Sequence, residues 1–158
     1  MLQTDYPFIQ YEYLHALEAS GCVCAESGWQ PNHLIVRLQD LVVAVMPLYI
    51  KTHSYGEYVF DFQWANAFHQ VGLNYYPKLV SAIPFTPCAG ERLCIKADYC
   101  DDLLPVILQQ VVNLAKSLNI LSWHLLFPKS DLSSLKQNSG IMQRSGMQYH
   151  WLNKNYQS

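Results

Sequence analysis

The pattern of apolar and polar positions changes its period several times along the chain, and these changes predict alternating helices and strands. In several segments apolar residues recur at helical spacing between an aspartate and a glycine or asparagine, residues that favour the two ends of a helix. We therefore expect helices over residues 5–20, 61–72 and 101–119, with a shorter helix over residues 131–138.

Between these helices, alternating or continuous apolar runs are typical of β-strands. We expect strands over residues 33–38, 41–50, 79–85, 92–96, 120–127 and 147–152, with a turn over residues 28–31. The run from Leu41 to Ile50 is apolar on both faces and should lie centrally in the sheet. Pro47 should mark a bulge or the end of regular pairing, because proline has no amide proton to donate. Gln39 and Asp40 would join this strand to the preceding one as a hairpin.

The order of these elements predicts the fold class. Helices and strands alternate, and the early consecutive strands can pair antiparallel. The sequence therefore favours an α/β (α+β) fold, with a mixed, largely antiparallel sheet flanked by helices on both faces. At 158 residues the chain has the length of one ordinary domain with a sizeable core.

Charged residues are scarce. They make up 14% of the chain and apolar residues 51%, whereas a typical soluble domain has about 25% charged residues. Such a chain either buries an unusual fraction of itself or exposes apolar surface, and exposed apolar surface would meet a partner, a second copy or a neighbouring domain. The net charge is -2 and the basic residues are scattered, so we expect no DNA partner.

The sequence lacks the features of membrane-spanning and secreted proteins. No apolar run reaches the roughly 20 residues of a membrane-spanning helix, and residues 1–5 lack the basic start and apolar core of a signal peptide. The five cysteines form no C-x-x-C pair, so we interpret them as reduced thiols of a cytoplasmic protein.

The common motifs of metal binding and catalysis are also missing. The six histidines show no pair at ligand spacing, so no metal site is expected, and His124 and His150 are interpreted as residues of strands. Neither a G-x-S-x-G elbow nor a G-x-x-x-x-G-K phosphate loop occurs. Residues 143–148 partly match the loop by which acetyltransferases hold coenzyme A. They precede a strand rather than a helix, and we treat the match as chance.

Candidate chemistry gathers in residues 42–92, above all directly after the expected central strand. The polar and aromatic residues there are Lys51, His53, Ser54, Tyr55, Glu57 and Tyr58. Glu57 or His53 could accept a proton, and the other groups could bind a polar substrate. Lys78 and Arg92 could hold an anionic group. Alternatively, the tyrosines pack and the charges are solvated, which would leave no site here.

Four stretches resemble one bacterial protein family: GWQPNHL, VMPLYIKTHSYGEYVFDFQWANAF, YYPKLVSAIPFTPCAGERL and QYHWLN. They are similar to motifs of FemAB-like proteins, which are described as peptidoglycan biosynthesis proteins or as relatives of the GNAT acyltransferases. The resemblance covers almost the whole chain, from Pro7-Phe8 to Trp151. It adds Thr86, in the third stretch, to the candidate substrate-binding positions.

The resemblance implies a GNAT-like fold and a transfer reaction. FemAB-type transferases carry two GNAT-like halves and add amino acids from aminoacyl-tRNA to cell-wall precursors. Residues 1–158 resemble the first half of such a protein, as one GNAT-like domain. The implied partners are a second half or a homodimer through an apolar surface, and a muropeptide or other amine substrate. Acyl-coenzyme A and aminoacyl-tRNA are the implied donors, and no cofactor is implied with certainty.

We therefore predict an acyl- or aminoacyl-transferase of GNAT/FemAB-like fold that acts on an amine acceptor linked to cell-wall peptidoglycan. Glu57 or His53 would be the base, and positioning and hydrogen bonds would do much of the remaining work. The alternative is a non-catalytic binding or scaffold module that recognises a glycan-peptide or a protein partner. Binding of a muropeptide without transfer would favour the module.

Overall fold

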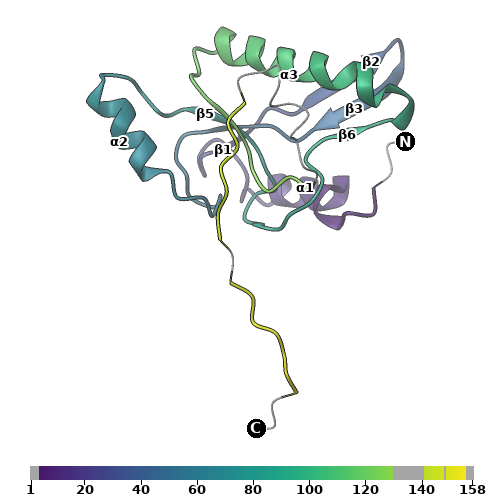
Figure 1. Ribbon diagram of the computed structural model, residues 1–158. Helices are drawn as coiled ribbons and strands as arrows, with labels where there is room; N and C mark the ends of the chain where they lie inside the picture. Colours follow the sequence, from purple (N-terminus) through teal and green to yellow (C-terminus); the bar gives the residue numbers. More distant parts are fainter. Residues whose placement is uncertain (1–3, 130–140, 148, 156–158) are drawn as a thin grey trace.

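The computed structural model of the chain describes residues 4–129, 141–147 and 149–155. Its helices are η1 (Pro7–Ile9), α1 (Tyr11–Ala19), α2 (Phe62–Gln70), η2 (Ala97–Tyr99) and α3 (Cys100–Ser117). Its strands are β1 (Trp29–Pro31), β2 (Leu34–Leu38), β3 (Leu41–Met46), β4 (Tyr49–Lys51), β5 (Lys78–Ser81), β6 (Cys94–Ile95) and β7 (Trp123–Leu125). Figure 1 shows this mixture of helices and mostly antiparallel strands, which confirms the α+β class.

The strands form two sheets rather than the one expected. The larger sheet has the order β1-β4-β5-β7, and its neighbours are antiparallel except for the parallel pair β5 and β7. The smaller sheet has the order β2-β3-β6 and is antiparallel throughout. The expected strand 41–50 is divided at Pro47-Leu48, where regular pairing ends as the proline predicts. As a result β3 enters the smaller sheet and β4 the larger one.

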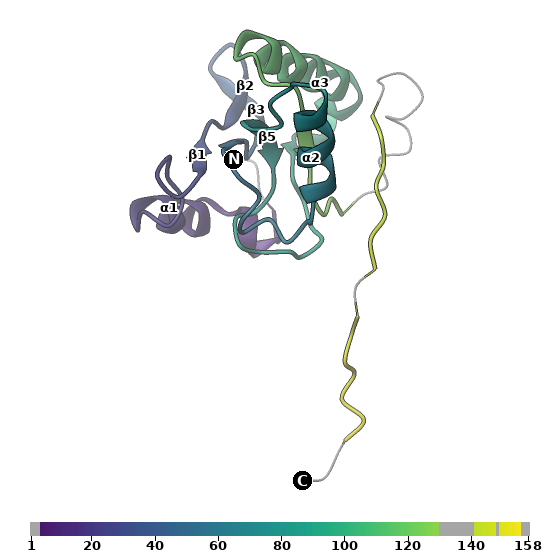
Figure 2. The same ribbon diagram turned by 90° about the vertical axis from the view of Figure 1, so that its left-hand side faces the viewer.

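Two apolar clusters cover opposite faces of the larger sheet. One joins Ile107 of α3 to Leu79 of β5. The other joins Val80 of β5 to Tyr49 of β4 and to Leu17 of α1. Leu79 and Val80 belong to different clusters because successive side chains of a strand point to opposite faces. Figures 1 and 2 show α3 on one side and α1 on the other, so helices cover both faces, as the sequence predicts.

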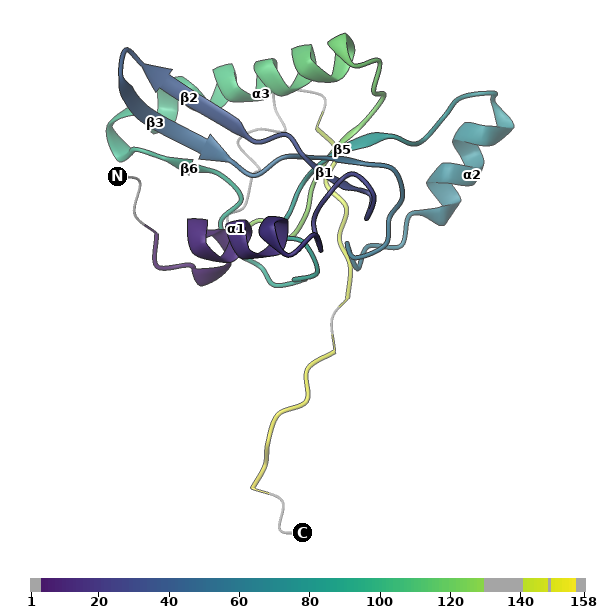
Figure 3. The same cartoon turned by 180° about the vertical axis from the view of Figure 1, so that it is seen from behind.

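Helix α2 stands away from this core. None of its residues is buried, and Figures 1 and 3 show it beside the larger sheet rather than on either face. Phe62 and Trp64 are 58% and 47% exposed, and Phe60, just before the helix, is 75% exposed. Part of the apolar surface that the composition predicts therefore lies on and around α2.

Two helix starts differ from the capping pattern, those of α1 and α3, whereas Asp61 precedes α2 as expected. The first helix is interrupted at Gln10, whose ψ of 148° is extended, and Asp5 therefore caps no α-helix. Helix α3 begins before Asp101 and Asp102, which lie in its first turn instead of capping it. After α3, Asn119 has the positive φ of 54° that is typical of a residue ending a helix.

The strands are shorter than the apolar runs predict, because only part of each run meets a partner strand. Residues 28–31, expected as a turn, contain the edge strand β1. The two-residue hairpin at Gln39 and Asp40 is confirmed. The described residues of 147–152 form no strand, and the helix expected over 131–138 lies outside the described residues.

Candidate functional site

Two lysine side chains lie buried at one end of the larger sheet. The antiparallel register of β4 and β5 places Lys51 directly opposite Lys78, and both residues are 0% exposed. Removing an ammonium group from water is costly unless charges and hydrogen bonds of the protein replace that water. The surroundings of both amines must therefore supply this compensation.

Lys78 uses all three of its N–H donors. Its Nζ donates to Ser54 Oγ at 2.9 Å, to Glu57 Oε2 at 2.8 Å and to Asp61 Oδ2. We call these four residues the Lys78 cluster. Both carboxylates are buried, so the ion pairs are closed to solvent. Because an ammonium group has three donors and no acceptor, Lys78 is saturated in this conformation.

Asp61 also binds two tyrosines. Its Oδ2 accepts a hydrogen bond from the Tyr75 hydroxyl at 2.7 Å, and its Oδ1 accepts one from the Tyr76 hydroxyl at 3.4 Å. Burial acts to raise the pKa of Asp61, but its hydrogen bonds, above all that from Lys78, outweigh burial and hold the pKa below its usual value. Asp61 precedes α2 as predicted, yet its side chain makes no capping hydrogen bond, since its oxygens are occupied by the cluster.

Glu57 has an unused oxygen. Oε2 accepts the hydrogen bond from Lys78, whereas Oε1 is buried and has no hydrogen-bond partner among the described residues. Burial raises the pKa of Glu57, although the charge of Lys78 opposes the rise. A buried carboxylate oxygen without a partner is costly. Among the described residues, the Lys78 ammonium group donates to Glu57 at Oε2, so a proton reaching this carboxylate would pass through Lys78.

Lys51 is less well compensated than Lys78. Its Nζ donates to the Tyr55 carbonyl at 3.1 Å and lies 3.9 Å from the centre of the Trp29 ring, in a cation–π contact. Burial lowers the pKa of Lys51 to about 8, and the charge of Lys78 adds to this effect while that of Glu57 opposes it. Near pH 8, Lys51 is therefore neutral in a substantial fraction of the molecules.

The imidazole of His53 is held by main-chain contacts. Its Nδ1 accepts a hydrogen bond from the Tyr55 amide at 3.3 Å. Its Nε2 lies so close to Gly28 that a Cβ added there would come within 2.2 Å. Burial lowers the pKa of His53, and the charge of Lys51 lowers it further. The ring is therefore neutral near pH 7 and could accept a proton only by giving up a present contact.

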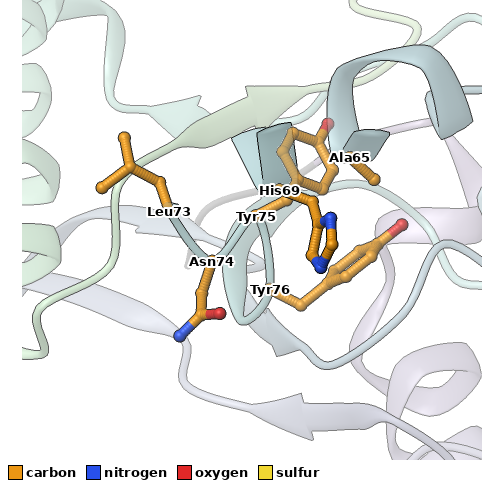
Figure 4. A pocket seen from close by; sticks show the side chains of 6 residues that line it. All are labelled: Ala65, His69, Leu73, Asn74, Tyr75 and Tyr76. Atoms are coloured by element: carbon orange, nitrogen blue, oxygen red, sulfur yellow. The ribbon is translucent and has the colours of Figure 1, made fainter. Parts of the chain in front are cut away.

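An open depression of about 280 Å³ lies between α2 and the segment that leads into β5. The residues that line it are Ala65, His69, Leu73, Asn74, Tyr75 and Tyr76 (Figure 4). The Tyr76 hydroxyl and Ser54 Oγ are 2.7 Å apart, and the Tyr75 hydroxyl donates to Asp61. The two tyrosines therefore connect the wall of the depression with the Lys78 cluster by hydrogen bonds.

His124 extends this network into β7. Its Nε2 lies 3.4 Å from the Tyr75 hydroxyl and 3.2 Å from Ser122 Oγ. Burial lowers the pKa of His124 to about 4, with a smaller contribution from the charge of Lys78. His124 is a strand residue, as the sequence indicates. It is also a neutral hydrogen-bonding neighbour of the site.

The remaining candidate residues lie apart from the Lys78 cluster. The side chains of Tyr55 and Tyr58 are exposed. Thr86 Oγ1 and the Tyr13 hydroxyl are 3.0 Å apart. The guanidinium of Arg92 is buried and donates to three main-chain carbonyls. Of the candidates, the structure thus brings together Lys51, Ser54, Glu57 and Lys78.

The loop that carries Glu57 meets the loop that carries Thr86 at one point. The Phe85 amide donates to the Gly56 carbonyl at 3.1 Å, and a Cβ on Gly56 would lie 2.6 Å from the Phe85 ring. Gly56 also has a φ of 81°, which disfavours other residues. The two loops are therefore joined by close packing at a glycine.

Asp61, Tyr75 and Tyr76 belong to the site but are not among the residues predicted from the sequence. The capping pattern explains Asp61 without any site, and tyrosines before a strand are ordinary packing residues. One signal was available in the sequence. Lys78 begins the buried strand β5, and a lysine buried with such a strand requires a carboxylate partner.

The described part of the chain contains no cluster suited to a metal. Within residues 4–129, 141–147 and 149–155, no group of three His, Cys, Asp or Glu side chains gathers in a way that could hold an ion. In the same residues, none of the helices combines the length and the hydropathy that crossing a bilayer requires.

One protein family matches the whole chain. Its sequence model covers residues 1–158, and the family is described as FemAB-like, of peptidoglycan biosynthesis/recognition. The chain belongs to the FemAB-like family. The resemblance seen in the sequence motifs is thereby confirmed, and the family gives this FemAB-like chain a peptidoglycan-related role. No curated protein and no solved structure matches it, so the GNAT-like arrangement stays a prediction.

Proposed function

We propose that this FemAB-like chain takes part in acyl or aminoacyl transfer to an amine of a muropeptide, at the depression beside the Lys78 cluster. One observation carries the proposal. A path of hydrogen bonds leads from the wall of the depression to a buried carboxylate, through Tyr76, Ser54, Lys78 and Glu57. The link of the family with peptidoglycan supplies the class of acceptor.

In the proposed reaction an amine attacks the carbonyl carbon of an activated donor. A C–N bond forms, and the C–S bond of an acyl-coenzyme A or the C–O bond of an aminoacyl-tRNA breaks. The amine loses a proton and the leaving group gains one. Proton transfer by a positioned group typically contributes about 10²- to 10⁴-fold to a rate. This path of hydrogen bonds is suited to such a transfer.

The proton passes along the path in steps that conserve charge. For the transfer, the Tyr76 hydroxyl turns from Asp61 to Ser54 Oγ. Lys78 gives a proton to Glu57 Oε2 and becomes a neutral amine, which then takes the proton of Ser54. Ser54 takes the proton of Tyr76, and Tyr76 takes one from the attacking amine. Glu57 ends protonated, Lys78 remains an ammonium group, and the proton on Glu57 is later returned to the leaving group.

Glu57 is the better placed of the two predicted bases. Its Oε2 accepts a hydrogen bond from Lys78 at the end of the path, whereas His53 Nδ1 accepts a hydrogen bond from the Tyr55 amide and lies outside the path. The raised pKa of Glu57 brings it closer to neutral pH, where a general base is most effective.

The proposal is tested by incubating the chain with a muropeptide that carries a free amine and with acyl-coenzyme A or aminoacyl-tRNA. We expect mass spectrometry to detect the acylated muropeptide. Glu57→Gln keeps the shape of the side chain but cannot hold the proton, so transfer should fall by about 10²-fold or more. The rate of Tyr76→Phe should fall similarly, while Tyr11→Phe, at an exposed tyrosine of α1 outside the path, should keep the wild-type rate. Wild-type transfer by Glu57→Gln would remove the assignment.

A second candidate function is recognition without chemistry. Three exposed aromatic residues within six positions of the sequence, Tyr55, Tyr58 and Phe60, favour it, since exposed apolar surface marks binding sites. The same experiment separates the two functions. Muropeptide binding by the wild-type chain with either donor present, and no acylated product, would support the recognition module and contradict transfer.

We also propose that the apolar surface around α2 meets a partner. Phe60, Phe62 and Trp64 lie exposed on and before an uncharged helix that covers no face of a sheet. The resemblance implies two binding partners for this surface, a second copy of the chain or a second GNAT-like half. This proposal is tested below through the mass of the chain in solution.

A further inference from the structure

Two buried side chains on one face of the larger sheet have N–H groups to spare. The register of β1 and β4 sets Trp29 directly opposite Lys51, and both residues are 0% exposed. The Trp29 Nε1–H group has no hydrogen-bond partner among the described residues. The Lys51 ammonium group lies 3.9 Å from the centre of the same indole ring and donates to the Tyr55 carbonyl. Because an ammonium group has three donors, this one contact leaves Lys51 with free donors beside the free donor of Trp29.

The ring of Phe85 lies next to the free N–H group of Trp29. A Cβ on Gly56 would come within 3.1 Å of Trp29 Nε1 and 2.6 Å of the Phe85 ring, so both groups border the same bare Cα. Phe85 is 42% exposed. Its φ of 58° is a value that a bulky residue rarely adopts. Turning the Phe85 ring aside would therefore open a way from solvent to a buried donor.

Buried free donors favour a ligand that offers an acceptor. A buried N–H group without a partner is costly, and a carbonyl or carboxylate oxygen would remove that cost. The charge of Lys51 favours an oxygen that itself carries negative charge. The donors also lie near the path of hydrogen bonds, because Lys51 is opposite Lys78 and Gly56 directly precedes Glu57. They therefore suit an oxygen on which charge develops during the proposed transfer.

We infer that Trp29 Nε1 and Lys51 Nζ hold the carbonyl oxygen of the acyl donor once the Phe85 ring has turned aside. The inference rests on the proposed transfer and names the residues that bind the acyl group. As the amine attacks, the C–N bond forms and the π electron pair of the C=O bond moves to this oxygen, where the two N–H groups stabilise the charge. The C=O bond then re-forms, the C–S or C–O bond breaks, and the leaving group takes the proton held by Glu57.

A direct contact between Lys51 and Glu57 is the competing arrangement. Glu57 Oε1 is buried and has no hydrogen-bond partner among the described residues, and the charges of Glu57 and Lys51 attract each other. A turn of the Lys51 side chain towards Oε1 would satisfy both groups without any ligand. Lys51 would then offer less to a carbonyl oxygen, so a binding measurement distinguishes the two arrangements.

The experiment is an NMR titration of the full chain near neutral pH with acetate, acetamide and methylammonium. These probes are similar in size, and they carry a charged oxygen, a neutral carbonyl oxygen and no acceptor, respectively. We expect acetate to move the indole N–H signal of Trp29 saturably and acetamide to bind about tenfold more weakly, because a hydrogen bond to a charged group is the stronger one. Methylammonium should have no effect. The Trp123 signal is the internal control, since its Nε1 already donates to Ser81 Oγ at 3.0 Å.

Four variants locate the binding. Trp29→Phe keeps a ring beside Lys51 but has no N–H group, so the acetate affinity, measured at the Gly56 amide signal, should fall by about tenfold. Lys51→Met should abolish binding, whereas Lys116→Met, at an exposed lysine of α3, should leave it unchanged. Phe85→Ala removes the ring that must turn aside and should tighten the binding. Unchanged affinity in Phe85→Ala would exclude the Phe85 ring as the cover.

Two results would overturn the site: no saturable movement of the Trp29 signal by acetate, or an acetate affinity that survives both Trp29→Phe and Lys51→Met. The outcome is distinguishable from a failure of the proposed transfer. A chain that binds acetate through Trp29 and Lys51 but acylates no muropeptide keeps the oxygen-binding site and loses the reaction. A chain that acylates the muropeptide at the wild-type rate in both variants keeps the reaction and loses the site alone.

Discussion

At the scale of single residues, Lys51 and Lys78 show how two identical side chains in paired positions acquire different properties. Lys78 donates to two carboxylates and a hydroxyl. Lys51 donates to one carbonyl and lies over the Trp29 ring. The carboxylates thus offset desolvation mainly for Lys78, and Lys51 remains the amine whose charge is easiest to lose.

The lowered pKa of Lys51 predicts a rise of stability with pH. The folded chain releases the Lys51 proton at about pH 8, whereas the unfolded chain keeps it up to the usual pKa of 10.5. Between these values the unfolded state binds more protons, so the free energy of unfolding increases with pH; near pH 7 both states hold the proton and this gain is absent. The gain should be on the order of 1 kcal/mol or more.

This pH effect is measured by urea unfolding of the wild type and of Lys51→Met at about pH 8 and about pH 10, within the window in which one group gains up to about 1.4 kcal/mol per pH unit. Methionine fills a similar volume and cannot titrate, so the difference between the two proteins isolates Lys51. Stability that changes equally with pH in both proteins would contradict the prediction.

At the scale of elements, Asp61 separates two explanations for the start of α2. As a helix cap, Asp61 could be replaced by Asn at almost no cost, because both residues cap well. As the buried partner of Lys78, Asp61 could not be replaced by Asn without loss of stability, because breaking a buried ion pair costs about 3–5 kcal/mol. We expect Asp61→Asn to lower the free energy of unfolding by several kcal/mol. Asp98→Asn, at an exposed aspartate, should change it by about 0.5 kcal/mol or less. Equal, small effects would support the cap.

The elements also show what the sequence can predict. Local chemistry decides the break at Pro47, the hairpin at Gln39 and the helix end at Asn119, and all three are as expected. The Lys78 cluster is different. It depends on the register that sets Lys51 opposite Lys78 and on the loop that returns Glu57 to both. No local pattern contains that register, so Glu57 was predicted as a candidate base from its neighbourhood while its ion pair was not.

At the scale of the whole molecule, helices cover both faces of the larger sheet, whereas no other element of the described chain buries a residue of α2. Helices α1 and α3 account for the two apolar clusters, whereas α2 has no buried residue. Burying apolar surface stabilises an association by about 25 cal/mol per Å² before its costs. Burying the exposed aromatic residues of this helix against a partner would therefore contribute favourably to the free energy of association.

We expect the chain to self-associate through this surface. In light scattering the mass should rise with concentration from 18.2 kDa towards twice that value. The double variant Phe60→Ser, Trp64→Ser removes two large exposed aromatic side chains and should restore the monomer. Val106→Ser removes an exposed apolar side chain of α3 and should not. A wild type that stays monomeric at high concentration would exclude the second copy. The second half would then be the partner to test, because hydrophobic surface of this kind is the usual signature of an interface.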